Sequence, residues 1–502
     1  MMIRNFTDIK SLLLDNRSIK QIVFKNTFWL VMAEVIQGGI VFVITIWLAR
    51  HFGPAIYGKF AFALSFVMLF SVLADFGFGT LTVREIARDK SKTAQYIDNI
   101  IATKFVLGLI TLGLIVLVIQ FFGKEPEVVK LVYFLGIYII INTFATFFQA
   151  IFRANEKMQY ETICRVIQSL SLLGLVAFFI LNKGSILTIG YAYIGAALIG
   201  AIISSGAIWH YFLKFFLKID FKICKEILKE AWPFGLSFIF ISAYYYIDTV
   251  MLSVMKTDQI VGWYNSAYRI LMILSIAPSI LFNAVFPRMS LLFISAKETL
   301  KLIYQQFLKY IFIISFPTCV GMTLLAEKFI LLIYGSDFIP ATIALQILVW
   351  SFLFTFFGGL FGNLLNACNK QTALMIITGL ATVINILLNL FLIPQFNYIG
   401  ASIVANLTRF FVIAVAFYIL LKIGFAPQKE FYFKTGPKVI FAAICMGIFI
   451  AIFKEMNLFF LVLFSVVIYF GILFLLKELR KEEFFSLKKI LINNSSFGRN
   501  KL

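Results

Sequence analysis

The chain has 502 residues, of which 61% are hydrophobic and 14% are charged, whereas soluble domains have about 45–50% apolar and about 25% charged residues. This composition excludes an ordinary soluble domain. It predicts an all-α polytopic membrane protein, because a helix satisfies its own backbone hydrogen bonds within lipid. The formal net charge is +20, and what it indicates depends on where the basic residues lie.

Apolar runs long enough to cross a hydrocarbon core of about 30 Å recur from residue 26 to residue 476, separated by short polar connections. The first run is too long for the apolar core of a signal peptide, so we expect it to be retained. The runs predict about fourteen transmembrane helices, at residues 26–49, 55–78, 99–122, 128–152, 161–182, 187–213, 231–255, 261–287, 305–333, 340–366, 370–395, 398–424, 436–453 and 457–476.

The basic residues predict how these helices are oriented. With the N-terminus in the cytoplasm, 33 lysines and arginines lie on the cytoplasmic side, 8 lie on the other side, and Lys104, Arg269 and Arg409 lie within helices. This bias follows the positive-inside rule and predicts a multi-pass protein of the cell membrane with both termini in the cytoplasm. Topology and attraction to anionic membrane lipids account for the basic surface, so we expect no nucleic-acid partner.

An internal repeat predicts the domain organisation. IYGKFAFALSF, which begins at residue 56, aligns with IVGWYNSAYRI 204 residues later, so that Gly58 matches Gly262. The same offset matches Arg84 to Arg288. The two copies are six predicted helices apart, an even number, and therefore have the same orientation. Parallel repeats of this kind commonly hold a transporter's substrate site between them.

The repeat divides the chain into five expected parts. The linker sequence, KFFLKIDFKICKEILKE, mixes lysines with apolar residues and is typical of a helix in the membrane interface. The parts are an N-terminal lobe of six helices (1–213), this amphipathic linker (214–230), a C-terminal lobe of six helices (231–424), two extra helices (425–476) and a cytoplasmic tail (477–502).

Catalytic and cofactor motifs are not found in the sequence. The five cysteines have no metal-ligand spacing, and there are two histidines, so neither a zinc site nor a haem site is expected. A Gly-rich nucleotide loop is also missing, which speaks against ATP hydrolysis. We therefore expect no metal and no cofactor. A membrane glycosyltransferase or polymerase is the enzyme alternative, and the short outer connections leave little room for its catalytic groups.

Six segments, taken together, resemble the lipid-linked oligosaccharide flippases, the Wzx-type polysaccharide-biosynthesis transporters. The likeness covers nearly the whole chain, and the segments occur in the same order and with similar spacing. The segments are LARHFGPAIYGKF at 48–60, LADFGFGTLTVREIARDKS at 73–91, DTVMLSVMKTDQIVGWYNSAYRI at 248–270, LLIYGSDFIPA at 331–341, GNLLNACNKQ at 362–371 and VINILLNLFLIPQFNYIGAS at 383–402.

The resemblance implies a fold of two six-helix lobes and two further helices, shared with lipid II flippases and multidrug and toxin extruders. It also implies a substrate, a polyprenyl-diphosphate that carries a sugar repeat unit and is moved from the cytoplasmic to the outer leaflet. The expected partners are membrane lipids, this lipid-linked sugar and glycan-assembly enzymes.

Asp248 and Arg269 are the first candidates for substrate contact. They lie 7 and 8 residues from the outer ends of successive predicted helices, so at roughly 1.5 Å per residue both are about 10–12 Å below the outer surface. Charges at such depth usually face a cavity or one another. Two interpretations stay open: a structural ion pair, or an arginine that meets a diphosphate or acidic sugar while the aspartate holds it in place. Tyr245 is a candidate for stacking on a sugar ring.

Other charged residues are graded by depth. Arg409 lies near the middle of its helix, where snorkelling is hardest, and is expected to face a cleft. Glu34 has no obvious local partner in the sequence. It is a candidate for binding a coupling proton or sodium ion, and the alternative is a buried, hydrogen-bonded carboxyl. Lys104 lies close to the cytoplasmic interface and is expected to snorkel. Asp75, near the inner end of its helix, is expected to cap or to pair with Arg84 or Arg88, and the alternative is a direct role in transport.

Arg84, Arg153 and Arg288 lie at the predicted cytoplasmic rim. A diphosphate would arrive there first, although ordinary positive-inside residues occupy the same place. The runner-up function is a cation-coupled exporter of small amphipathic molecules on the same fold. Glu34 and Asp248 would suit its cationic substrates, whereas Arg269 and Arg409 suit anions.

Overall fold

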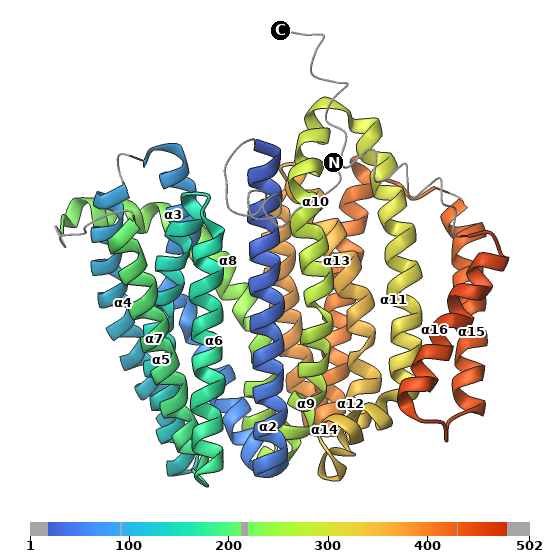
Figure 1. Cartoon of the computed structure of the whole chain (residues 1–502), viewed down its shortest axis with the longest axis horizontal. Helices are drawn as coiled ribbons and strands as arrows, with labels where there is room; N and C mark the ends of the chain where they lie inside the picture. The colour runs from blue at the N-terminus through green and yellow to red at the C-terminus, as the bar shows by residue number, and fades with distance from the viewer. Residues whose placement is uncertain (1–18, 91–92, 212–218, 429, 479–502) are drawn as a thin grey trace, which may run out of the picture. The chain divides into compact units, whose positions relative to one another are not determined.

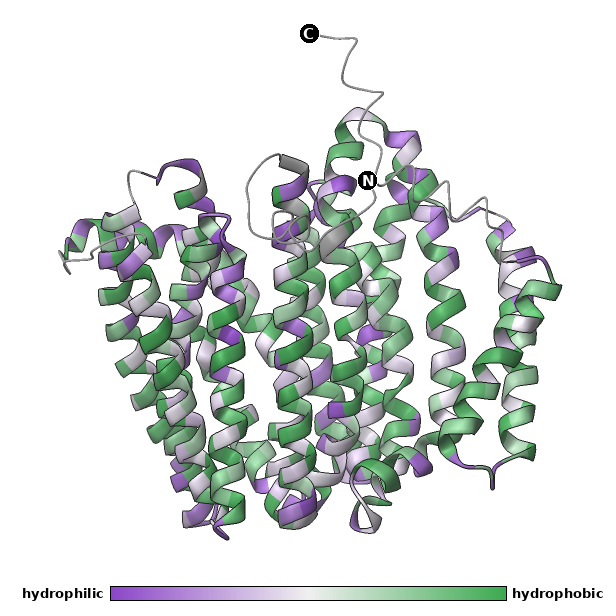
Figure 2. Ribbon diagram, in the orientation of Figure 1, coloured by the Kyte–Doolittle hydropathy of each residue, from purple (hydrophilic) through white to green (hydrophobic). Residues whose placement is uncertain are grey.

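The computed structural model describes residues 19–90, 93–211, 219–428 and 430–478. Every regular element within these ranges is helical (Figure 1), as the composition predicted. Hydrophobic residues cover most of the length of the helices, and hydrophilic residues gather toward their ends (Figure 2). The chain is therefore an all-α polytopic membrane protein.

The helices form two units, residues 1–265 and 266–502, with the boundary inside α9. The first unit holds α2 (Ile19–Asp75), α3 (Phe78–Arg88), α4 (Thr93–Gln120), α5 (Pro126–Ala154), α6 (Met158–Leu181), α7 (Ile186–Tyr211), α8 (Phe221–Met255) and the start of α9 (Asp258–Leu274).

The second unit holds the end of α9 and the helices that follow it in the chain. They are α10 (Ile276–Ser295), α11 (Lys297–Ile333), the short 3-10 helix η2 (Ser336–Phe338), α12 (Ala341–Leu348), α13 (Trp350–Ala367), α14 (Gln371–Lys422), the π-helix η3 (Phe431–Thr435), α15 (Gly436–Ile452) and α16 (Leu458–Leu475).

Twelve helical ranges in the described residues are long and apolar enough to cross a membrane. Two of them contain a non-helical residue, Gly53 (φ 74°) in α2 and Asn397 (φ 53°) in α14. Glycine adopts positive φ freely, and asparagine tolerates it better than most residues. These residues lie between helices that the sequence predicted as separate. Dividing both ranges there gives fourteen segments, in agreement with the predicted count.

The predicted linker is only partly described. Residues 214–218 lie outside the described residues, and from Phe221 onward the linker forms the first turns of α8, which continues through Pro233. Asp220 caps this helix by accepting hydrogen bonds from the backbone amides of Lys222 and Ile223. The Asp220 amide in turn donates to Asn99 Oδ1 of α4 at 2.7 Å. The start of α8 is thereby attached to α4, and the predicted lobe boundaries stay a prediction.

The repeated glycines meet at one crossing within the first unit. A Cβ atom on Gly58 of α2 would overlap the Asp258 carbonyl oxygen, and a Cβ atom on Gly262 of α9 would overlap the Pro54 carbonyl oxygen. Two helix backbones can come this close only where neither carries a side chain at the contact. The match between the repeats therefore corresponds to a reciprocal backbone contact, which we call the glycine crossing.

The glycine crossing can be tested by adding one methyl group. We expect Gly262→Ala to lower the free energy of unfolding by about 1–3 kcal/mol, because the added Cβ atom forces the two backbones apart. Gly113→Ala on α4 is the matched control, because a Cβ atom there meets open space. Thermal unfolding of the purified protein measures both variants. Equal unfolding temperatures would show that the crossing tolerates a side chain.

Candidate functional site

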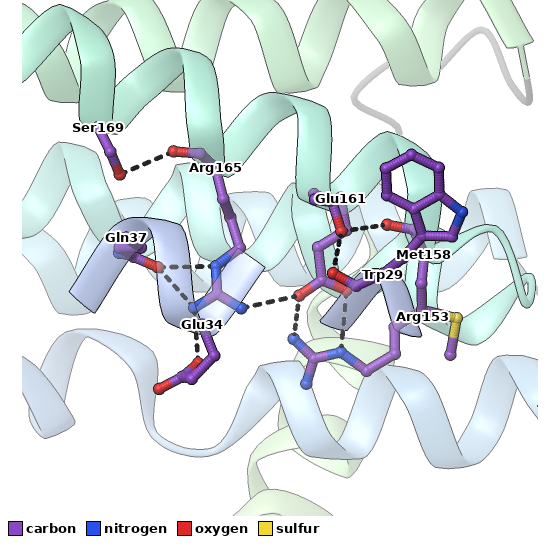
Figure 3. A network of polar contacts seen from close by, with 9 residues as sticks. Trp29, Glu34, Gln37, Arg153, Met158, Glu161, Arg165 and Ser169 are labelled. Carbon is purple, nitrogen blue, oxygen red and sulfur yellow. Dashed lines mark hydrogen bonds and ion pairs between the residues drawn. The ribbon is translucent and has the colours of Figure 1, made fainter. Parts of the chain in front are cut away.

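A chain of alternating charges connects α2 with α5 and α6 in the first unit (Figure 3). Arg153 binds Glu161 through two atoms, with Nη2 2.6 Å from Oε1 and Nε 3.1 Å from Oε2. Arg165 lies on the other side of the same carboxylate, with Nη1 3.8 Å from Glu161 Oε1. Its Nη2 atom reaches Glu34 Oε2 at 3.1 Å and donates to Gln37 Oε1 at 2.5 Å. We call these five residues the Glu161 network.

Burial differs sharply along the Glu161 network. The Glu161 side chain is 1% exposed, whereas the Glu34 side chain is 47% exposed. A carboxylate buried as deeply as Glu161 needs charged partners, and here two arginines provide them. Glu34 forms the accessible end of the network. A ligand or an ion can therefore reach Glu34 without breaking the buried pairs of Glu161.

The structure assigns Glu34 and Arg153 partners that the sequence did not reveal. Glu34, for which no partner was evident, pairs with Arg165 from a helix 131 residues away. Arg153, expected at the rim, lies in the last turn of α5 and binds Glu161. One signal was available, since Glu161 and Arg165 are four residues apart and therefore share a helix face. Which residue of α2 completes the set depends on tertiary packing.

Two expectations were wrong: Lys104 does not snorkel, and Asp75 pairs with Lys104 instead of Arg84 or Arg88. The Lys104 side chain is fully buried, and its Nζ lies 2.7 Å from Asp75 Oδ1 and 3.4 Å from the Ala74 carbonyl oxygen. Three phenylalanine rings surround the ammonium group at 5.8–5.9 Å. The helix α2 ends at Asp75, so the lysine meets both a carboxylate and the negative end of the helix dipole. With these partners, the buried position of the ammonium group has a lower free energy than a position at the membrane surface.

Arg84 and Arg88 bind Glu85 instead of Asp75. Arg84 Nε lies 2.6 Å from Glu85 Oε1, and its Nη2 lies 3.2 Å from Glu230 on α8. Arg88 Nη1 lies 3.1 Å from the same Glu85 oxygen. Arg84 thus joins α3 to α8 while remaining partly exposed.

Asp248 is buried on α8, where its Oδ2 accepts a hydrogen bond of 3.2 Å from the Tyr264 hydroxyl. The next residue, Thr249, donates to Asn265 Oδ1 at 3.3 Å. Three residues before the aspartate, Tyr245 is exposed. Tyr264 is the residue that sequence reasoning missed as a partner of Asp248. The pairing of Asp248 with Arg269 stays a prediction.

A second cluster surrounds Arg409 in the second unit. Arg409 Nη1 donates to Ser351 Oγ at 2.6 Å, and Nη2 donates to the Tyr268 hydroxyl at 3.3 Å. The Ser351 hydroxyl donates to Asn406 Oδ1, and Asn406 Nδ2 donates to the Ile347 carbonyl oxygen at 2.6 Å. Neutral hydroxyl groups from α9 and α13 thus contact the half-buried guanidinium and orient it.

The remaining sequence candidates are more dispersed. Arg269 is half-buried on α9, with Nη1 3.9 Å from Met272 Sδ. Arg288 is half-buried on α10. The structure therefore brings Arg409 together with Tyr268, the residue that precedes Arg269, and places Arg153 and Glu34 in one network. Roles in substrate binding for these residues stay predictions.

A basic residue lies near the glycine crossing. Lys124, in the connection between α4 and α5, donates from Nζ to the Ser253 carbonyl oxygen at 2.5 Å. Its Nζ is also 3.9 Å from Asp258 Oδ1. Burial lowers the pKa of the Lys124 ammonium below its ordinary value, against the opposite effect of the Asp258 carboxylate. These contacts attach the connection after α4 to the ends of α8 and α9.

Comparison with known families decides what kind of protein carries this arrangement. The family model described as "Polysaccharide biosynthesis protein" matches residues 23–293, just over half of the chain. The chain belongs to this family. A second model, MatE, matches residues 233–391.

Two curated proteins illustrate what the chain is similar to. It is 20% identical to "Probable low-salt glycan biosynthesis flippase Agl15" from Haloferax volcanii, with 93% of this chain and 99% of that protein covered. It is 31% identical to "Putative O-antigen transporter" from Shigella dysenteriae over 45% of this chain and 56% of that protein.

Solved structures share the fold. An inward closed conformation of the lipid II flippase MurJ superposes with a TM-score of 0.73 at 14% sequence identity, covering 89% of this chain and 97% of that chain. An inward-facing multidrug resistance MATE family transporter superposes with a TM-score of 0.61 at 18% identity, covering 83% of this chain and 99% of that chain. These superpositions confirm the expectation that the chain shares its fold with lipid II flippases and multidrug and toxin extruders.

The Glu161 network yields a stability prediction. We expect Glu161→Gln to lower the free energy of unfolding by about 3 kcal/mol, because two arginines lose their buried counter-charge. Glu34→Gln is the matched control on the same network. It should cost less than about 1 kcal/mol, because Glu34 is half exposed and its ion pair is weak. Tryptophan fluorescence during thermal unfolding measures both variants, and equal losses would contradict the assignment of Glu161 as the buried centre.

Proposed function

We propose that the protein is a flippase that translocates polyprenyl-diphosphate-linked oligosaccharides across the cytoplasmic membrane for the synthesis of a cell-surface glycan. Its relatives carry the names of flippases and O-antigen transporters, which favours a transporter over a catalyst. The observation that carries the proposal is the Arg409 cluster, a guanidinium near the middle of a membrane helix, oriented by Ser351 and Tyr268. Such a group suits a phosphate that must leave water.

The chemistry of the substrate explains why such groups are needed. Sugar hydroxyls and a diphosphate lose water on entering hydrocarbon, and each unreplaced hydrogen bond is costly. The protein must offer them polar partners while the prenyl chain remains in lipid. Arg409, Arg269, Asp248 and Tyr245 are the residues that we assign to this role. We place both termini in the cytoplasm, and the distribution of basic residues supports this orientation.

Alternating access requires that one end of the substrate path can open and close. We assign the closed outer end to the glycine crossing together with Lys124. The backbone contact at Gly58 and Gly262 leaves no space between the two helices. Lys124 then holds Ser253 and Asp258 beside it. Opening this end toward the outer leaflet would separate the repeats and release Lys124.

A cation-coupled exporter remains the second candidate function. The observation that favours it is the half-exposed Glu34 carboxylate at the accessible end of the Glu161 network. An accessible carboxylate beside an arginine can release the arginine when it binds a coupling proton or a sodium ion. This role is compatible with a flippase driven by an ion gradient.

Translocation by the purified protein in proteoliposomes distinguishes the two functions. A fluorescent polyprenyl-diphosphate oligosaccharide and a cationic dye serve as parallel substrates. We expect the lipid-linked sugar to move and the dye to stay. We also expect Arg409→Ala to reduce the rate about tenfold or more, since a hydrogen-bonded charge contact is lost, and Arg269→Ala to reduce it as well. Movement of the dye alone would identify an exporter, and unchanged rates in both variants would remove these arginines from the substrate path.

The outer closure can be tested by cross-linking. We expect a cleavable thiol-reactive cross-linker to stop translocation by the Lys124→Cys/Asp258→Cys double variant, because the two positions must separate in each cycle. Reduction of the linker should restore transport. Each single cysteine variant, treated with the same reagent, controls for modification alone. Undiminished transport after complete cross-linking would place the moving end of the path elsewhere.

A further inference from the structure

The two C-terminal helices create a cavity that the transport cycle described above does not use. The helices α15 and α16 pack on α11 through an apolar cluster that includes Ile313, Met446 and Tyr469. Beyond this cluster, at the end where α11 and α15 begin and α16 ends, lies a cavity of about 350 Å³. Pockets that hold small ligands have volumes of roughly 300–1,000 Å³. We call it the α11–α15 cavity.

Charged side chains line the α11–α15 cavity. A buried carboxylate, Glu478, lies just after α16 and is bound by two lysines, Lys309 at 3.0 Å and Lys438 at 2.9 Å. The Thr435 hydroxyl donates to the same carboxylate at 2.7 Å. Burial by itself would raise the pKa of Glu478, and the hydrogen bonds from Lys438, Thr435 and Lys309 outweigh it, so that its pKa lies below the ordinary value. Glu478 is therefore ionised at neutral pH.

The lysines of the cavity outnumber its carboxylates. Lys434 and Lys477 line the same space, are exposed, and form no ion pair with any described residue. Glu430 is the other acidic residue of the lining. Because Glu478 already binds Lys309 and Lys438, it does not neutralise Lys434 and Lys477. The electrostatic potential around these two lysines therefore stays positive. An anion that enters would gain these two ammonium groups as partners.

The surroundings indicate which anion fits. One helical turn beyond Lys309, an apolar groove of about 260 Å³ begins on α11 and continues between α15 and α16. A ligand that bridges both spaces has a phosphate at one end and hydrocarbon at the other. The groove is lined in part by Ile314, Pro317, Gly321, Met446, Val466 and Phe470.

We propose that the α11–α15 cavity binds the phosphate of an anionic membrane phospholipid, with Lys434 and Lys477 as its direct ligands and the acyl chain on the adjacent groove. The cavity lies at the membrane end where headgroup phosphates are found. Basic pockets between transmembrane helices on the cytoplasmic side are known to take such headgroups. Glu478 holds Lys309 and Lys438 at the back of the cavity and thereby shapes it.

The test compares two double variants of the full chain. Lys434→Ala/Lys477→Ala removes the two proposed ligands. Lys370→Ala/Lys422→Ala removes the same charge from exposed lysines at the same membrane end of the second unit that do not line the cavity. Native mass spectrometry measures the binding of phosphatidylglycerol, and phosphatidylcholine serves as the net-neutral comparison. Elution profile and unfolding temperature confirm that both variants fold.

We expect the affinity for phosphatidylglycerol to fall about tenfold in Lys434→Ala/Lys477→Ala and to remain unchanged in Lys370→Ala/Lys422→Ala. Equal losses in the two variants would reduce the effect to general surface charge and overturn the site. Two further probes identify the source of the phosphate. If the protein binds inorganic phosphate but no phospholipid, the cavity is a site for a free anion. If Lys434→Ala/Lys477→Ala loses only the binding of polyprenyl-diphosphate, the cavity belongs to the transported lipid. Either result overturns the proposal.

Discussion

The cost of placing charge in hydrocarbon governs the internal organisation of this protein. Lys104 and Glu161 are both fully buried, and each is matched by an opposite charge from another helix. The desolvation free energy of such a group is offset only by close partners with good geometry. The pairs therefore dictate which helices must be neighbours: α2 with α4 through Lys104 and Asp75, and α5 with α6 through Arg153 and Glu161. Apolar packing alone is far less selective, because lipid competes with it.

A transporter also needs contacts that can be broken, and we assign that role to the glycine crossing. It contains few side chains and brings backbone against backbone at Gly58 and Gly262. Lys124 beside it binds a carbonyl oxygen and a carboxylate at longer distance, 3.9 Å. Contacts of this kind close a path without the deep, fully matched charges of the Glu161 network. The two kinds of contact thus differ in burial and in charge.

A buried carboxylate paired with lysines from other helices also occurs beside the two C-terminal helices, at the membrane surface. Glu478 lies just beyond the last transmembrane helix and binds lysines from α11 and α15. Its carboxylate is buried, yet surplus lysines remain around it. A membrane protein whose surface meets anionic lipid can complete such a site with a headgroup phosphate. Lipid then becomes part of the packing of α15 and α16, in the way that an ion pair is part of the packing of α2.

The class of protein, the helical segments and the repeat could be predicted from the order of the amino acids. Hydrocarbon thickness sets the length of a spanning helix, so apolar runs alone located fourteen segments, including the breaks at Gly53 and Asn397. The match between Gly58 and Gly262 was also evident in the amino-acid sequence. The partners of the charged residues were not. Lys104 was expected to snorkel, and Glu34 had no evident partner, because an ion pair between helices depends on rotation and packing that no local pattern records. Helix packing in three dimensions places Asp75 beside Lys104, brings Arg165 to Glu34, and lets Ser351 and Tyr268 hold Arg409.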